Sequence, residues 1–338
     1  MIKKLTLITC VAALATFPLA AQDAKPVFPS PPEIVAKAKA EEWTAIAPSD
    51  LLVMDLAPDA KGKARRVVIQ LIPPPFSQGW VGNIRKLAAA KWWDGTSINR
   101  VQDNYVVQWG DATEKKVLPE GLVTVSEAAY ASSLFEWQNE NAKRDKERQD
   151  KQASEVSTPP IVKKVELEPY PAWHSRDPFA FWVDFYRGWP IATAGYSWEQ
   201  IWWPTHCYGM VGVGRNLSPD TGTGAELYAV IGHAPRHLDR NIALVGRVIE
   251  GLEHLSSLPR GTGPLGFYEK EEERVQINSA RLGDEIADLP AFEYLSTDSA
   301  SFAAYADARA NRRDPFFITP AGGADICNIP VPVRRKAK

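Results

Sequence analysis

The sequence has few of the residues that bind metals or cross-link chains. Its 338 residues include only three cysteines, three methionines and five histidines. His233 and His237 have a spacing that metal ligands use on helices, but the sequence places no third ligand beside them, so we expect no metal and no cofactor. Basic and acidic residues nearly balance, with a formal net charge of −2. This balance argues against nucleic acid as a partner and against a polybasic membrane patch.

Long apolar runs are absent after the N-terminus. Two lysines precede an apolar segment from Leu5 to Leu19, and Ala20-Ala21 offers small residues for cleavage. This order is typical of a signal peptide over residues 1–21, so we predict an exported protein, periplasmic or secreted. No run reaches the ~18 residues that cross a bilayer, so we expect no stable membrane insertion. Lipid anchoring at Cys10 is less favoured, because this cysteine lies inside the apolar segment.

Export changes the interpretation of the cysteines. Loss of the signal peptide leaves Cys207 and Cys327, an even number in a compartment where disulfides persist. A Cys207–Cys327 bridge is one prediction, and two buried free thiols are the alternative, because the sequence does not show their separation.

Short β-branched and aliphatic segments dominate the chain outside one long interruption. They are bounded by turn residues and accompanied by few helical patterns, which favours an antiparallel barrel or sandwich over an α/β fold. Helices are expected over residues 80–91, 250–258 and 299–310. Strands are expected over residues 51–56, 66–72, 208–213, 225–231, 242–248 and 274–280.

The segment from Trp93 to Asp111 carries the most specific pattern. A Trp-Asp-Gly turn is followed by Arg100 and then by a Gln-Trp-Gly-Asp end. It resembles the core motif of cyclophilins, the peptidyl-prolyl cis-trans isomerases, which runs from Tyr-Asp-Gly through Phe-His-Arg to Gln-Gly-Gly-Asp. The stretch from Val245 to Gly251 is similar to the family's Phe-Gly-x-Val-x-x-Gly signature.

The resemblance implies a mainly β protein built on a closed eight-stranded antiparallel barrel with two capping helices. It covers about residues 50–111 and 206–282. We therefore expect a cyclophilin-like domain over residues 50–282 that carries a helical and aromatic insertion over residues 112–205. An N-terminal extension (22–49) and a C-terminal extension (283–338) would complete the chain.

The resemblance also assigns roles to single residues. Arg100 would be the catalytic donor, Tyr105 a pocket aromatic residue, and Gln108 the amide that holds the substrate backbone. Strand alternation alone would place Tyr105 and Gln108 on opposite faces, so their common pocket is implied only by the family. The remaining predicted substrate-binding residues are Met210, Glu226, Tyr228, His237 and Leu238.

Several positions depart from the family pattern. Asn99 replaces the histidine of Phe-His-Arg, Ile242 replaces a pocket histidine, and Glu226 replaces a glutamine. His237 stands where the family often has tryptophan. Glu226 leaves two alternatives, since its carboxylate could orient Arg100 by pairing with it or could neutralise it.

The insertion has features of its own. The residues from Thr124 to Glu127 form a capping-box pattern that predicts a helix with Tyr130, Leu134 and Trp137 on one face. The stretch 140–151 is almost wholly charged, and 170–204 holds six of the twelve tryptophans. This aromatic stretch is either the core of the insertion or an exposed surface for a partner.

The leading hypothesis is an isomerase that acts on X–Pro bonds of exported polypeptides and assists their folding. The alternative is a module of the same fold that binds proline-containing segments, or acts as a chaperone, without useful turnover. A hydrolase is least favoured, because Gly195-Tyr-Ser-Trp-Glu199 matches only the first half of a nucleophile elbow.

Overall fold

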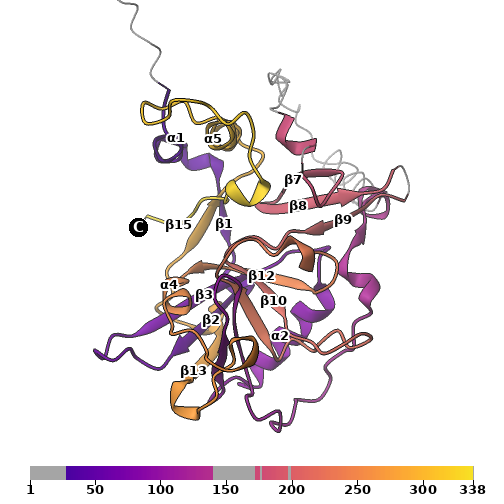
Figure 1. Ribbon diagram of the computed structural model, residues 1–338, viewed down its shortest axis with the longest axis vertical. Coiled ribbons are helices and arrows are strands. Elements are labelled where there is room, and N and C mark those ends of the chain that lie inside the picture. Colours follow the sequence, from indigo (N-terminus) through magenta and orange to yellow (C-terminus); the bar gives the residue numbers. More distant parts are fainter. Residues whose placement is uncertain (1–27, 140–171, 176, 197–198, 338) are drawn as a thin grey trace, which may run out of the picture.

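The centre of the molecule is a closed antiparallel barrel of eight strands (Figure 1). We describe a computed structural model, which covers residues 28–139, 172–175, 177–196 and 199–337. The expected signal peptide and the charged stretch 140–151 lie outside these residues. The strand order around the barrel is β10-β11-β5-β4-β13-β2-β3-β12. The strands are β2 (Leu51–Leu56), β3 (Arg65–Leu71), β4 (Ser97–Val101), β5 (Val106–Gly110), β10 (Met210–Val213), β11 (Leu227–Val230), β12 (Leu244–Glu250) and β13 (Val275–Leu282).

The barrel confirms the expected fold class, and its strands lie where the β-branched segments predicted them. β2 and β3 form a hairpin that pairs Leu51 with Gln70 through Leu56 with Arg65. Side chains of this hairpin fill the barrel interior together with Ile98, Val107 and Val211, all of them buried. Burial of aliphatic surface on this scale is the main force that stabilises such a fold.

Helix α2 (Gln78–Ala89) covers the barrel, as the apolar spacing of its sequence predicts. Trp80, Ile84 and Leu87 recur at helical spacing and are fully buried. The second expected helix is much shorter, because α4 (Glu253–Ser256) makes a single turn that buries Leu255 alone.

The two extensions of the chain pair with each other. Strand β1 (Trp43–Ile46) pairs with β14 (Phe292–Leu295), which pairs with β15 (Val333–Arg335), so both ends contribute to one three-stranded sheet. Helix α5 (Ala300–Ala310) lies beside α1 (Pro31–Lys37) (Figure 1). The Oγ of Ser299 caps α5 by accepting a hydrogen bond from the amide of Phe302 at 3.0 Å.

The described part of the insertion is mainly a sheet with the order β6-β9-β8-β7. The helix expected to open at Thr124 is replaced by a 3-10 turn at Glu127–Tyr130, and residues 134–139 are helical only after the short strand β6. The Oγ of Ser126, not Thr124, caps the turn by accepting from the amide of Ala128. The strands are β6 (Ser132–Ser133), β7 (Trp182–Tyr186), β8 (Trp189–Ala194) and β9 (Ile201–Pro204).

The aromatic stretch of the insertion is partly buried and partly exposed. Trp189, Trp202 and Trp203 are almost completely buried, whereas Phe181 and Tyr196 are largely exposed. A second apolar core joins the insertion to the extensions. It contains Val183, Ala192 and Trp203 of the insertion sheet together with Trp43, Leu295, Phe302 and Tyr305.

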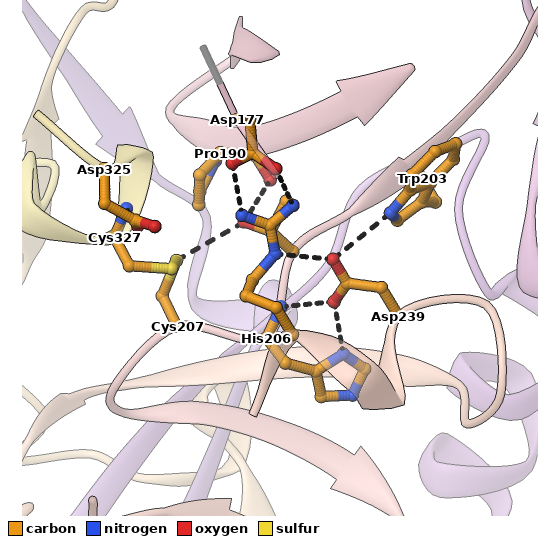
Figure 2. The surroundings of a disulfide bond; sticks show 10 residues. Asp177, Pro190, Trp203, His206, Cys207, Asp239, Asp325 and Cys327 are labelled. Carbon is orange, nitrogen blue, oxygen red and sulfur yellow. Dashed lines mark hydrogen bonds and ion pairs between the residues drawn. A yellow bond between two sulfur atoms is a disulfide. The ribbon is translucent and has the colours of Figure 1, made fainter. Parts of the chain in front are cut away.

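A disulfide ties the C-terminal extension to the chain just before β10. The Sγ atoms of Cys207 and Cys327 are bonded, and the bridge joins residues 120 positions apart (Figure 2). None of the helices in the described ranges is long and apolar enough to cross a membrane.

Candidate active site

A cavity of about 690 Å³ opens where β4, β5 and β11 lie side by side. The strand register places Arg100 opposite Gln108, and Gln108 opposite Tyr228. These three residues therefore form a row across three strands, and all of them line the cavity. Asp111, Lys116 and Arg215, among others, line its more polar part.

A β-bulge helps to place the arginine. The pairing of β4 with β5 shifts between Ile98 and Arg100, and such bulges redirect side chains. Tyr105 precedes the first residue of β5, so strand alternation does not apply to it, and it lines the same cavity as Gln108. The family's implication of a common pocket therefore agrees with the geometry, although simple alternation does not.

Arg100 is held by neutral groups. Its Nε donates to the carbonyl of Leu265 at 2.8 Å, and one Nη donates to Oε1 of Gln108 at 3.1 Å. The other Nη donates to Oε1 of Gln102. Burial lowers the pKa of Arg100, but the guanidinium stays charged at physiological pH.

Two aromatic rings enclose the same guanidinium. Its Cζ lies 5.7 Å from the centroid of Tyr105 and 5.3 Å from that of Phe267. Contacts of this kind orient the planar group. Within the described ranges, no carboxylate lies within 4.0 Å of the guanidinium. Three of its five N–H groups are bonded to residues that the structure describes, so the others can be donated to a ligand.

Glu226 reaches Arg100 only through Gln108. The Nε2 of Gln108 donates to Oε2 of Glu226 at 3.3 Å, while the Oε1 of the same amide accepts from Arg100. Burial raises the pKa of Glu226 to about 7 and outweighs the hydrogen bonds from Gln108 and Asn99, which lower it. Gly110 makes room for the carboxyl group, because a Cβ there would lie 1.9 Å from Oε1.

An apolar slot adjoins the arginine. Val106, Tyr228 and Val230 form a small buried cluster against which Tyr105, Leu238 and Ile242 pack. Gly212 permits the position of the Tyr228 ring, since a Cβ on Gly212 would lie 2.3 Å from it. The slot has the apolar character that a proline ring requires.

Most of the predicted site residues meet at this cavity. Arg100, Tyr105, Gln108, Glu226, Tyr228 and Leu238 all line it. His237 does not line it, but its exposed ring stacks on Tyr105 with centroids 6.3 Å apart.

Met210 does not line the cavity. It is the first residue of β10 and is buried in the main core, whereas the cavity reaches this part of the chain only beyond the other end of the strand, at Gly214.

Sequence reasoning also missed part of the site. Phe267 and Leu265 come from a loop far along the chain, and Phe267 forms an isolated bridge with Arg100. No local pattern could have paired them. Within the described residues, no cluster of three or more His, Cys, Asp or Glu side chains could hold a metal.

The arrangement suits rotation about an X–Pro bond, whose barrier of about 18–20 kcal/mol comes from amide conjugation. A fixed, charged donor favours a pyramidal prolyl nitrogen over a conjugated one, so its interaction strengthens as the bond twists. A side-chain amide that binds the substrate backbone and an apolar slot for the ring are the other requirements, and no nucleophile is needed.

Comparison with known proteins indicates the family of the chain. The chain matches the family model described as cyclophilin type peptidyl-prolyl cis-trans isomerase/CLD over residues 66–282. Among curated proteins, no sequence matches it. The solved structure of cyclophilin AquaCyp293 from Hirschia baltica is similar, with 21% identity and a TM-score of 0.58 over 89% of this chain and 100% of that chain.

A cyclophilin type isomerase of Cryptosporidium parvum, solved in the presence of the dipeptide Ala-Pro, is more distant. It has 11% identity and a TM-score of 0.34 over 68% of this chain and 98% of that chain, which is too low to support an argument. The likeness to AquaCyp293 shows the fold, and the family model covers more than half of the chain. The protein therefore belongs to the cyclophilin-type peptidyl-prolyl cis-trans isomerase family.

Proposed function

We propose that this isomerase is exported and acts on X–Pro bonds of polypeptides that arrive unfolded in an oxidising compartment. The observation that carries the site assignment is the row of Arg100, Gln108 and Tyr228 across three paired strands beside an apolar slot. In this proposal Arg100 donates to the prolyl nitrogen, Gln108 holds the substrate backbone and Tyr228 contacts the proline ring.

Two features support export. The first 21 residues have the order of a signal peptide, and a disulfide joins Cys207 to Cys327. Disulfides persist mainly in oxidising compartments. Residues 1–21 fused to alkaline phosphatase should yield active phosphatase in a bacterial host, because that enzyme requires export to form its own disulfides. An inactive fusion, beside an active control with an established signal peptide, would contradict export.

A folding substrate tests the proposed role directly. We expect the chain from Gln22 onward to accelerate the slow refolding phase of an oxidised protein whose refolding is limited by a trans-to-cis X–Pro step. Acceleration at substoichiometric concentration requires turnover. The matched control is the variant Arg100→Ala, which should leave the slow phase close to its spontaneous rate.

A binding module is the second candidate, and the Glu226–Gln108 hydrogen bond is the observation that favours it. A carboxylate that holds the amide of Gln108 competes with a substrate backbone for the same group. Under this alternative the protein would bind the unfolded chain and suppress its aggregation only at stoichiometric concentration, without changing the slow rate.

A further inference from the structure

A chain of buried polar side chains lies behind the wall of the proline slot. The Nε2 of His206 lies 2.9 Å from the hydroxyl oxygen of Tyr228, and its Nδ1 lies 2.9 Å from Oδ1 of Asp239. His206 is only 1% exposed, Tyr228 4% and Asp239 5%. Tyr228 is also one of the slot residues that line the cavity, so the histidine touches the back of a surface that faces the substrate.

The direction of each hydrogen bond follows from Asp239. Its carboxylate only accepts, and its Oδ1 takes both the backbone N–H of His206 at 2.9 Å and the ring Nδ1. The Nδ1 of His206 therefore carries a proton, and in the neutral ring the Nε2 is left as an acceptor. The hydroxyl of Tyr228 donates to that Nε2, so its one proton is used away from the cavity.

The hydrogen bond to His206 satisfies the buried hydroxyl of Tyr228. Cyclophilins have phenylalanine at the position of Tyr228, so the hydroxyl is an added polar group. A buried hydroxyl without a hydrogen-bond partner destabilises the fold. The ring already lies against Gly212, where no Cβ would fit. An acceptor at a fixed place behind the ring satisfies the hydroxyl and also fixes the plane of the ring in the slot wall.

We propose that His206 is a positioning residue of the isomerase, which holds the ring of Tyr228 in the geometry that receives the substrate proline. This inference rests on the proposed assignment of the slot. His206 touches neither the substrate nor Arg100, so it acts on peptide binding and leaves the catalytic donor unchanged.

The same network connects the slot to the insertion. The Oδ2 of Asp239 accepts from Nε of Arg236 at 2.6 Å and from the indole of Trp203 on β9 at 3.3 Å. Arg236 in turn forms an ion pair with Asp177 at 2.7 Å. Figure 2 shows Asp177, Trp203, Asp239 and His206 around this cluster, beside the disulfide.

The network also reaches a second residue of the slot. Leu238, another slot residue, lies between Arg236 and Asp239 in the chain, so anchoring these two neighbours also fixes its backbone. Tyr228 is thus held by His206, and the neighbours of Leu238 are held by Asp177 and Trp203 of the insertion. These contacts join the substrate site of the barrel to Trp203 and Asp177 of the insertion.

The variant His206→Asn isolates the bond to Tyr228. The amide nitrogen of asparagine can replace Nδ1 and still donate to Asp239, but nothing replaces Nε2. We expect the KM for a proline peptide to rise about three- to tenfold, which corresponds to the loss of one buried hydrogen bond, with kcat within about twofold of wild type. The double variant His206→Asn/Tyr228→Phe removes the unsatisfied hydroxyl and should return KM towards the wild-type value.

His174→Asn is the matched control. His174 is also buried, at 3% exposure, and its Nδ1 lies 2.8 Å from the carbonyl of Val183 in the insertion sheet, outside the cavity. This variant should lower the melting temperature without changing KM. An unchanged KM in His206→Asn, an equal rise in His174→Asn, or a double variant that keeps the raised KM would each overturn the proposal.

A measurement on the wild-type protein covers the case in which His206→Asn does not fold. The ¹⁵N resonances of His206 should report a ring protonated at Nδ1, and the Nε2 resonance should shift when a saturating Ala-Pro peptide is added, whereas those of His174 should not. A ring protonated at Nε2, or an Nε2 resonance whose chemical shift does not change when the peptide is added, would overturn the proposal. If the wild-type protein shows neither peptide saturation nor turnover, the proposed function fails first. Turnover with an unmoved His206 overturns this inference alone.

Discussion

Glu226 should make the isomerase depend on pH near neutrality. Burial raises the pKa of its carboxyl group to about 7, and the nearby charge of Asp111 acts in the same direction, although hydrogen bonds from Gln108 and Asn99 partly oppose them. A peptide in the cavity excludes more water from this carboxyl group, which disfavours its ionised form further. The peptide should therefore bind the protonated enzyme better than the ionised one.

The size of the effect follows from this pKa. With a pKa of about 7, roughly 90% of the enzyme carries a neutral Glu226 at pH 6 and roughly 10% at pH 8. When the neutral form is the competent one, kcat/KM falls about tenfold between these values. Arg100 stays charged throughout this range and does not contribute to the profile.

An exchange measurement by NMR on an Ala-Pro peptide, at pH values from 5.5 to 8.5, tests this prediction without a coupling protease. The variant Glu226→Gln should show a flat profile that exceeds wild type at pH 8. Glu293→Gln is the matched control, because Glu293 is buried in the three-stranded sheet away from the cavity and pairs with Arg334. A flat wild-type profile, or an equal slope in Glu226→Gln, would refute the reasoning.

Three predictions concern stability. The folded pKa of Glu226 lies above its ordinary value of 4.5, so its contribution to stability is present below that value and is lost as pH rises through about 7. Glu226→Gln should therefore raise the melting temperature at pH 8 and leave it unchanged at pH 4. Reduction of the Cys207–Cys327 bridge, or Cys207→Ser, should cost about 2–5 kcal/mol in chemical unfolding, and an unchanged midpoint would show that the bridge does not constrain the chain. Arg247→Ala should cost about 2–3 kcal/mol, because this buried arginine donates to the carbonyl of Gly188 at 2.6 Å and joins the barrel to the insertion; a loss below 0.5 kcal/mol in calorimetry would contradict that.

The sequence predicted what depends on local pattern. Aliphatic segments such as Leu51–Leu56 and the helical spacing of Trp80, Ile84 and Leu87 correspond to observed elements. Arg100 and Gln108 were found because an ordered motif surrounds them. Local order is enough for these features, since each is fixed by neighbours within a few residues.

The rest depends on pairing between distant segments. Met210 lies away from the cavity, because a motif match does not say which end of β10 meets it. Phe267 encloses Arg100 from a loop with no pattern of its own. The bulge between Ile98 and Arg100, and the pairing of β1 with β14 from opposite ends of the chain, are likewise set by tertiary packing.

The rate of X–Pro exchange in wild type and in Arg100→Ala tests the central claim most directly. Loss of one preorganised charged donor that acts in the transition state should lower kcat about a hundredfold, while circular dichroism and the melting temperature stay close to wild type. Arg100→Lys should not restore the rate, because an ammonium lacks the planar fork that bonds to Gln108 and Leu265. Turnover in Arg100→Ala equal to that of wild type would contradict the account.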